Sequence, residues 1–260
     1  MSDAFYLPDG DEFLSTELTR GPWDDRFQHA GPPTALVAAV VEDRHAREGV
    51  QVARATFEIL KPVPIGRLTV RTQVRRGGRN VELVEAALSD GDAELILARI
   101  WRIRHADALP VGDARPTLVP PPGPEEGAVR PFFPSGSTVG YHTAMEVRFL
   151  EGAFLDPGPA RVWMRMRYPL LPGREPSPIV RVLAAADSGN GVSAVLDYHH
   201  WLFINPDLTV YLHRLPEGEW IHLDAHTTVD PHGVGMAQTV ISDLLGEVGR
   251  GLQSLLVDRR

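Results

Sequence analysis

The stretch Pro33-Thr-Ala-Leu-Val-Ala-Ala-Val-Val-Glu-Asp-Arg-His-Ala-Arg47 predicts a helix that is buried on every side. Pro33 suits a first helical turn, where its missing N–H costs no hydrogen bond. Arg44 and Arg47 bring positive charge to the other end, which the helix dipole favours. Between these ends the residues are apolar all round and do not form a single stripe. Such a helix needs cover on all its faces, so the rest of the chain must wrap around it.

Four strand-like segments follow this helix. They cover residues 52–60, 67–75, 80–89 and 94–104, and they are separated by Pro62-Val-Pro64, Gly77-Gly78 and Asp90-Gly91. In the second segment Val70, Thr72 and Val74 alternate with polar residues, as expected of a half-buried strand. Proline and glycine at the breaks are typical of turns.

The same order of elements returns later in the chain. Ser177-Pro178 opens a second apolar helix that continues to Ala186, and strands are predicted at residues 201–214, 220–229, 235–243 and 248–258. Pairing Phe57-Glu-Ile-Leu-Lys-Pro62 with Tyr211-Leu-His-Arg-Leu-Pro216 keeps the later turns nearly in step. This internal repeat predicts a duplicated domain.

The predicted boundaries are an N-terminal unit at residues 1–105, a linker rich in proline and glycine at residues 106–138, and a C-terminal unit at residues 139–260. Further strands at 13–19, 141–150 and 161–168 would begin the two units. Only a curved antiparallel sheet can cover a helix that is apolar on all faces. We therefore predict an α+β double hotdog, in which two sheets that each wrap a helix meet edge to edge.

Composition excludes several kinds of function. The formal net charge is −8 at pH 7 and the basic residues are scattered, which argues against a nucleic-acid partner. The absence of cysteine excludes disulfides, thiolate metal sites and a cysteine nucleophile. The longest apolar stretch, residues 35–41, is too short to span a bilayer, and the N-terminus lacks the pattern of a signal peptide. We expect a cytoplasmic protein that does not act at a membrane.

Four motifs together resemble the thioesterase-like double-hotdog family. They are Gln28-His-Ala-Gly-Pro-Pro33, Ala185-Ala-Asp-Ser-Gly-Asn-Gly191, Trp201-Leu-Phe-Ile-Asn-Pro-Asp207 and Gly249-Arg-Gly-Leu-Gln-Ser-Leu255. They are similar, more distantly, to the bacterial type II acyl-CoA thioesterases. The resemblance covers both halves and is densest from Pro178 onward. It implies hydrolysis of acyl-CoA in fatty acid metabolism, with no metal or redox cofactor, by a homodimer.

The resemblance also implies a polar trio that falls on Asp187, Asn205 and Gln253. Asn205 stands where the type II enzymes have threonine, and its amide can still donate a hydrogen bond. A carboxylate near the core at position 187 needs hydrogen bonds, and partial desolvation makes it a stronger base. Gln253 shares a strand face with Leu255 and Val257, so its amide needs a partner such as Asp187 or a shared water.

The expected chemistry is attack of an activated water on the thioester. Asp187 would deprotonate the water while Asn205 and Gln253 hold it. The backbone N–H groups of Ala30 and Gly31, just before the first helix, are candidate donors to the oxyanion. His29 is expected to shape the substrate entrance or to cap the helix.

The two halves are not equivalent at these positions. Aligning Pro33 with Pro178 places Glu42 opposite Asp187 and Trp101 near Gln253, which predicts one working trio per chain.

Two other functions remain open. A catalytically silent acyl-CoA-binding protein would keep the pocket without turnover, and the departure at Asn205 favours it. An enoyl-CoA hydratase or dehydratase is suggested by the spacing of Asp24 and His29, but the Asn-Pro typical of that motif is missing.

Six histidines near the C-terminus lack the spacing of a metal site and are interpreted as surface and turn residues. These are His199, His200, His213, His222, His226 and His232.

Overall fold

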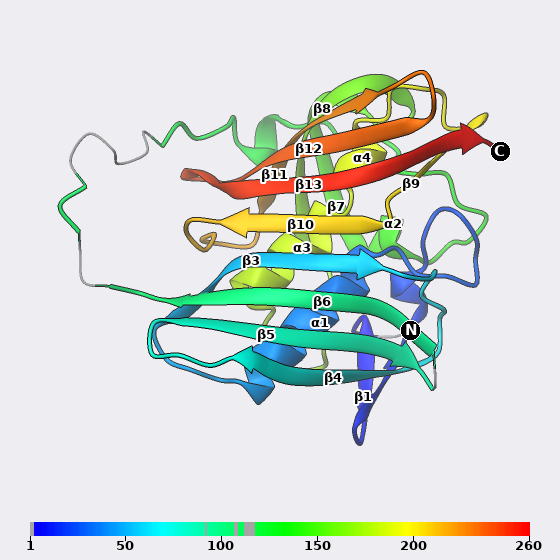
Figure 1. Cartoon of the computed structure of the whole chain (residues 1–260). Coiled ribbons are helices and arrows are strands. Elements are labelled where there is room, and N and C mark those ends of the chain that lie inside the picture. Colours follow the sequence, from blue (N-terminus) through cyan, green and yellow to red (C-terminus); the bar gives the residue numbers. More distant parts are fainter. Residues whose placement is uncertain (1–2, 92, 107–108, 112–117) are drawn as a thin grey trace.

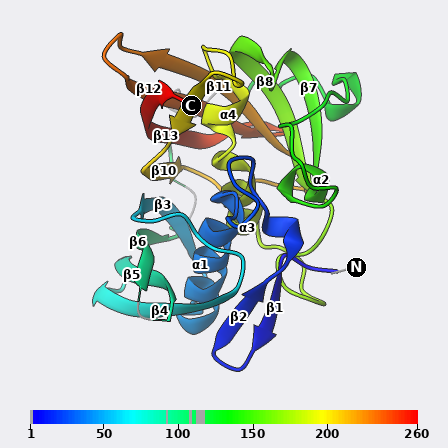
Figure 2. The same ribbon diagram turned by 90° about the vertical axis from the view of Figure 1, so that its right-hand side faces the viewer.

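Two helices are wrapped by one strongly curved antiparallel sheet (Figures 1 and 2). The computed structural model describes residues 3–91, 93–106, 109–111 and 118–260. The N-terminal half contains β1 (Tyr6–Asp9), β2 (Glu12–Ser15), η1 (Glu17–Thr19), α1 (Gly31–Arg44), β3 (Val50–Ile59), β4 (Arg67–Arg76), β5 (Val81–Asp90) and β6 (Ala93–Arg104). The C-terminal half contains η3 (Pro124–Glu126), α2 (Tyr141–Ala144), β7 (Met145–Ala153), β8 (Asp156–Met166), α3 (Pro178–Ala186), α4 (Gly189–Val192), β9 (Trp201–Ile204), β10 (Asp207–Leu212), β11 (Ile221–Val229), β12 (Val234–Asp243) and β13 (Gly246–Arg259).

The order of the strands shows the duplication directly. Along the sheet it runs β1-β2-β4-β5-β6-β3-β10-β13-β12-β11-β8-β7, and β9 pairs with β13 outside this path. The sequence β4-β5-β6-β3 is thus mirrored by β10-β13-β12-β11. The two halves meet where β3 pairs antiparallel with β10, with Phe57 opposite Leu208. This confirms the predicted α+β double hotdog with its sheets joined edge to edge. The domain boundaries stay a prediction, and residues 107–108 and 112–117 of the proposed linker lie outside the described residues.

The central helices form as their sequences predict. Proline occupies the first turn of α1, and every residue from Gly31 to Val41 is buried. α3 begins after Ser177, whose hydroxyl accepts a hydrogen bond from the Val180 N–H as a helix N-cap. Figure 2 shows both helices on the inner side of the curved sheet, with β1–β2 and β7–β8 at its two ends. Residues from both helices and both sheet halves belong to one continuous hydrophobic core.

The start of α1 and the end of α3 approach each other very closely. A Cβ atom added at Gly31 would lie 2.5 Å from the backbone oxygen of Ala184, a separation that real structures do not tolerate. Glycine at position 31 therefore allows this backbone contact. It brings the loop before α1 next to Asp187, the residue that follows α3.

Three strand predictions are wrong in detail. The segment 201–214 is interrupted at Asn205-Pro206 and forms two strands, β9 and β10, which pair with successive parts of β13. Proline has no N–H for the ladder, and the Pro206 carbonyl accepts from the Ile59 N–H. The segments 141–150 and 13–19 contain short helices, α2 before β7 and η1 after β2. β1 and α4 had no counterpart in the predictions.

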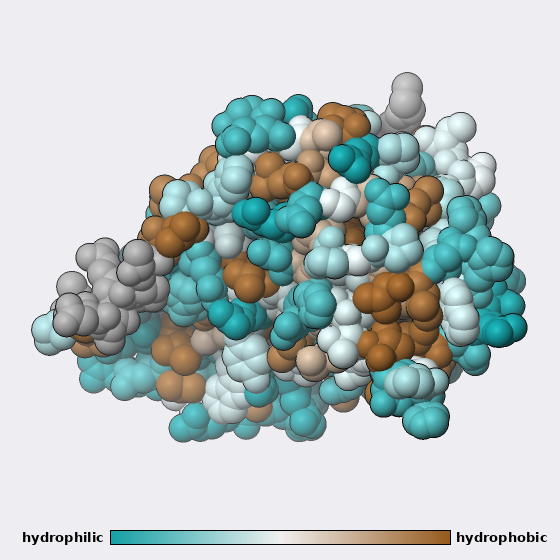
Figure 3. Space-filling view, turned by 90° about the horizontal axis from the view of Figure 1, so that it is seen from above, coloured by the Kyte–Doolittle hydropathy of each residue, from teal (hydrophilic) through white to brown (hydrophobic). Residues whose placement is uncertain are grey.

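The face of the molecule seen in Figure 3 is mostly hydrophilic, with hydrophobic side chains gathered at several places. In the described part of the chain, no helix is long and apolar enough to cross a membrane.

Candidate active site

Asp187 is a buried carboxylate. It follows the last residue of α3, and two residues later the chain enters the short helix α4. Only 5% of its side chain is exposed. A carboxylate so enclosed needs hydrogen-bond donors or a positive partner, because desolvation penalises its charge.

Two side-chain amides donate to the same oxygen of Asp187. The Asn205 Nδ2 lies 2.9 Å from Oδ1, and the Gln253 Nε2 lies 3.3 Å from the same atom. The Gln253 amide also donates to the backbone oxygen of Asp187 at 3.2 Å. The structure therefore brings the three residues singled out from the sequence into direct contact, from α3, the β9–β10 break and β13.

Asn190, in α4, links the two amides to each other. Its backbone N–H donates to Gln253 Oε1 at 3.1 Å, and its side-chain Nδ2 donates to Asn205 Oδ1 at 3.4 Å. Because the amide oxygens of Gln253 and Asn205 both accept from Asn190, the NH₂ groups of these two amides point toward Asp187. Asn190 was not among the site residues predicted from the sequence. Asn190 is buried, and a buried asparagine needs hydrogen-bond partners, but its helix α4 was not predicted from the sequence.

The second oxygen of Asp187 faces a histidine from the other half of the chain. His29 Nδ1 lies 3.2 Å from Asp187 Oδ2, and only 10% of the His29 side chain is exposed. Burial lowers the pKa of His29, and the nearby Asp187 charge opposes this effect. The Gly31 N–H, a candidate oxyanion donor, donates to the same Nδ1 at 3.1 Å.

Aromatic side chains cover this contact. The Tyr141 ring stacks on His29 with centroids 3.8 Å apart and planes 6° apart, and the Phe133 ring is nearly parallel to both, with its centroid 6.3 Å from each. The Tyr141 hydroxyl donates to the Ala184 carbonyl at 2.6 Å and lies 2.9 Å from Ser188 Oγ. Burial raises the pKa of Tyr141 well above its usual value. Tyr141 comes from α2, which was predicted as a strand, so the sequence did not indicate this wall of the site.

Asp24, the partner of His29 in the hydratase alternative, binds Arg26 instead of His29. The Asp24 side chain binds Arg26 at 2.7 Å, and this hydrogen bond lowers the pKa of Asp24 to about 2. Asp24 lies within a loop at the surface, whereas His29 faces Asp187. The arrangement thus gives no support to an Asp24–His29 pair of the hydratase type.

The equivalent positions of the N-terminal half have other partners. Glu42, near the end of α1, accepts from the Ser177 hydroxyl at 2.6 Å, and burial raises the pKa of Glu42. Trp101 lies beneath the Arg76 guanidinium, 5.6 Å from ring centroid to Cζ. The polar network around Asp187 is therefore not repeated at the other end of the helix pair.

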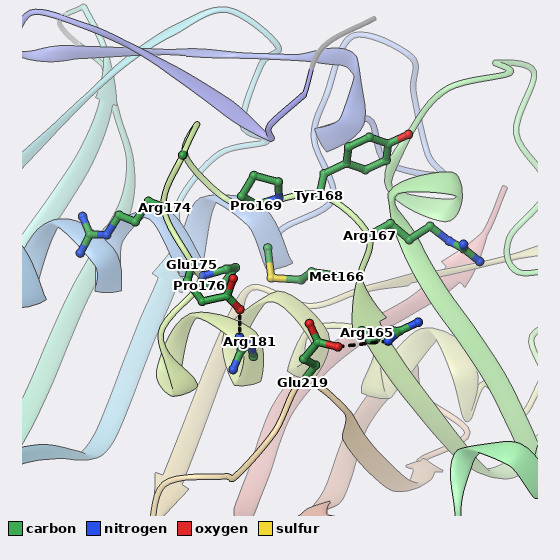
Figure 4. Close-up of a pocket in the computed structure, with 11 residues that line it drawn as sticks. Arg165, Met166, Arg167, Tyr168, Pro169, Arg174, Glu175, Pro176, Arg181 and Glu219 are labelled. Atoms are coloured by element: carbon green, nitrogen blue, oxygen red, sulfur yellow. Dashed lines mark hydrogen bonds and ion pairs between the residues drawn. The ribbon is translucent and has the colours of Figure 1, made fainter.

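A wide polar cleft lies apart from this site (Figure 4). Its volume is ≈ 450 Å³, and Arg165, Arg167, Arg174 and Arg181 line it together with Glu175 and Glu219. Figure 4 shows Arg181 bound to Glu175 and Arg165 bound to Glu219. Arg174 also pairs with Asp43, so three of the four arginines are neutralised by carboxylates of the chain itself.

One of the C-terminal histidines was wrongly interpreted as a surface residue. His222 on β11 is 2% exposed and packs against Trp163, with ring centroids 5.0 Å apart. The Trp163 indole donates to the Pro122 carbonyl at 2.8 Å, so the segment around Pro122 lies against β8 beside His222. Within the described residues, no group of three histidine or acidic side chains could hold a metal ion.

Comparison with known proteins identifies relatives of both halves. Residues 19–103 match the family model of the acyl-CoA thioesterase N-terminal domain, and residues 117–257 match that of the acyl-CoA thioesterase C-terminal domain. The search of curated proteins finds no match.

Solved structures are similar over nearly the whole chain. A candidate thioesterase from Novosphingobium aromaticivorans has 18% identity and a TM-score of 0.74, covering 97% of this chain and 98% of that one. A hot dog fold protein of unknown function from Alicyclobacillus acidocaldarius has 16% identity and a TM-score of 0.73, covering 99% and 97%. An acyl-CoA thioesterase II from Mycobacterium marinum has 16% identity and a TM-score of 0.65, covering 89% and 91%. At these identities the likeness shows the fold alone.

Proposed function

The chain belongs to the acyl-CoA thioesterase family, and from this we propose that it hydrolyses fatty acyl-CoA at the site centred on Asp187. The observation that carries the proposal is the enclosed carboxylate of Asp187, whose Oδ1 accepts from both Asn205 and Gln253. Hydrogen bonds to a carboxylate stabilise its charged form, which is the form that can accept a proton from water.

In the proposed reaction Asp187 acts as the general base. It removes a proton from a water molecule, whose oxygen then attacks the carbonyl carbon of the thioester. Asn205 and Gln253 hold the carboxylate through its Oδ1. To hold the water as well, one of these amides would have to exchange a present acceptor for it, because Gln253 already donates to two oxygens of Asp187. A positioned general base typically contributes roughly 10²- to 10⁴-fold in rate.

The negative charge that develops on the carbonyl oxygen needs donors of its own. We assign this role to the backbone N–H groups of Ala30 and Gly31, because they lie at the start of α1 and the helix dipole favours negative charge there. The Gly31 N–H donates to His29 in the present structure, so binding of the thioester would have to redirect it.

The test is release of free thiol from a panel of acyl-CoAs by the wild type and by Asp187→Asn. We expect the wild type to release thiol and the variant to lose at least about 100-fold in kcat, since a general base typically gives 10²- to 10⁴-fold. The chain has no cysteine and adds no background to a thiol assay. Glu42→Gln is the matched control, because Glu42 is the equivalent residue of the other half, and it should leave the rate nearly unchanged. No thiol from any acyl-CoA would contradict the proposal.

A silent acyl-CoA-binding protein is the second candidate. It is favoured by the direct contact of both amides with Asp187 and by Asn205 in place of threonine. Saturable binding of acyl-CoA in a calorimetric titration, without thiol release, would support this candidate. Loss of the enoyl absorbance without thiol release would instead indicate a hydratase.

We also propose that the chain acts in the cytoplasm as a homodimer. Support comes from three large aliphatic side chains that lie beside one another on the outer face of the sheet, Val234, Leu256 and Ile204. They are 69%, 54% and 43% exposed. Contiguous exposed apolar side chains of this kind commonly mark a contact surface.

A further inference from the structure

The contact between His29 and Asp187 joins the two halves of the chain, and the proposed general-base step does not use it. We propose that His29 is a further catalytic residue, which takes up the proton from Asp187 and delivers it to the leaving sulfur. This inference rests on the proposed thioesterase function. It assigns to the N-terminal half a chemical role beyond shaping the entrance.

His29 is held firmly against Asp187. Its backbone N–H donates to the Thr19 carbonyl at 2.8 Å, and its ring is stacked on Tyr141. The preceding residue, Gln28, accepts from the Tyr6 hydroxyl at 2.6 Å and donates to the Pro64 carbonyl at 2.7 Å. The ring therefore has little freedom to swing away from the carboxylate. Fixed geometry of this kind is what proton transfer requires.

The two groups next to His29 Nδ1 determine which nitrogen of the ring carries the proton. Nδ1 accepts from the Gly31 N–H, so in the resting state the ring proton belongs on Nε2. Nδ1 then presents a lone pair to Asp187 Oδ2 at 3.2 Å. Two acceptors at this distance repel each other mildly until one of them gains a proton. Once Asp187 has taken a proton from water, its hydroxyl can donate to Nδ1 and the proton can pass to the ring.

Burial keeps His29 ready to receive that proton. The desolvated ring has a lowered pKa, so it is neutral before the reaction begins. Desolvation also makes the transient imidazolium a stronger acid than an exposed one. Such an acid gives up its Nε2 proton readily to a thiolate.

The proposed reaction moves one proton from water to sulfur by way of Asp187 and His29. One O–H bond of water breaks and its proton moves to Asp187, while the water oxygen forms a bond to the carbonyl carbon. The C–S bond then breaks, and its electron pair leaves with sulfur. The proton on Asp187 passes to His29 Nδ1, and the Nε2 proton passes to sulfur, giving a carboxylic acid and a free thiol. The carboxylic acid ionises to solvent, and His29 regains its first tautomer by exchange with solvent.

The decisive experiment compares two leaving groups in the wild type and in His29→Asn. The asparagine amide can still reach Asp187 from the position of Nδ1 but cannot carry a proton to sulfur. With an acyl-CoA, whose alkyl thiolate is a poor leaving group, we expect kcat to fall roughly 10²- to 10⁴-fold. With the matching thiophenyl ester, whose aryl thiolate leaves without a proton, we expect a fall of less than about 10-fold.

Equal losses on both substrates would show that His29 only positions Asp187, and the proposal would be overturned. If circular dichroism shows that His29→Asn is unfolded, His29→Gln takes its place. The wild type gives an independent measurement, since its kcat should depend little on the acidity of the leaving thiol across a series of thioesters. A steep dependence would contradict proton delivery by His29. A wild type that hydrolyses neither ester would refute the thioesterase function itself, a result distinct from failure of the His29 role.

Discussion

At the scale of single residues, His222 is the buried group whose titration has the clearest consequence. Burial beneath Trp163 and the nearby Arg161 charge lower the pKa of His222 to about 4. Its Nε2 is enclosed and has no hydrogen-bond partner among the described residues. The folded chain therefore favours the neutral ring, whereas the unfolded chain takes up a proton below about pH 6.5.

The stability of the fold should consequently fall as the pH is lowered from about 6.5 to about 4. The unfolded state binds more protons in this interval, and the loss attributable to His222 amounts to about 3 kcal/mol at its lower end. Urea unfolding at several pH values measures it. His222→Gln should flatten this part of the profile, whereas His226→Gln, at an exposed position of the same strand, should leave it unchanged. Identical pH profiles for the two variants would exclude this role for His222.

Some residues of the candidate site could be predicted from the sequence, and others could be identified only in the structure. Asp187, Asn205 and Gln253 were singled out by resemblance, and the structure brings them together. The contact of His29 with Asp187 spans 158 positions of the chain, and no local pattern encodes such a distance. Asn190 was missed because its role depends on the side-chain orientation of two other amides. Whether these residues catalyse hydrolysis stays a prediction.

At the scale of elements, the crossing of α1 and α3 sets the geometry of the site. Gly31→Ala would place a methyl group 2.5 Å from the Ala184 carbonyl, and backbone on both sides would have to move. Overpacking of this kind typically costs about 1–3 kcal/mol. Because His29 and Asp187 lie at the same crossing, we expect the variant to lose activity as well as stability.

Chemical denaturation and thiol release measure these two effects of Gly31→Ala. Gly66→Ala is the matched control, since the space around Gly66 is open and its backbone is unstrained. The control should keep both stability and rate. Wild-type values for Gly31→Ala would mean that the helix crossing is not as close as the structure has it.

Element predictions succeeded where one pattern ran through the whole element. The all-round apolar sequence of α1 and the apolar run that follows Ser177-Pro178 in α3 were sufficient to predict both helices. The segment 201–214 failed because its apolar pattern continues past Asn205-Pro206, although the backbone does not. The interruption turns the Asn205 side chain inward to Asp187, so the failed prediction coincides with the candidate site.

At the scale of the whole molecule, duplication explains both the sheet and the single site. Mirrored strand order places α1 antiparallel to α3, so each end of the helix pair joins the start of one helix to the end of the other. One end carries His29 and Asp187, and the other carries Glu42 and Ser177. The repeat was visible in the sequence, but which ends meet depends on packing of the two halves.

The outer face of the sheet leads to the last prediction, that two chains associate there. Val234 lies opposite Leu256 on the neighbouring strand, and Leu256 lies opposite Ile204 on the other side. A row of exposed aliphatic side chains is favourable to bury, and the same surface on two chains can form a symmetric contact. We expect light scattering to give twice the chain mass of 28.6 kDa. Leu256→Glu should halve that mass without unfolding the chain, because the side chain is exposed in the monomer.

Leu14→Glu provides the control for this experiment, since Leu14 is 38% exposed and lies on β2, at the other end of the sheet from this row. It should leave the mass unchanged. A charged residue within a buried apolar contact is strongly unfavourable unless it is paired. Leu256→Glu should therefore disrupt the dimer if this row of side chains is the interface. A wild type at the mass of one chain would refute association. A dimer that survives the Leu256 change would place the contact on another face and leave this row of side chains without a role in assembly.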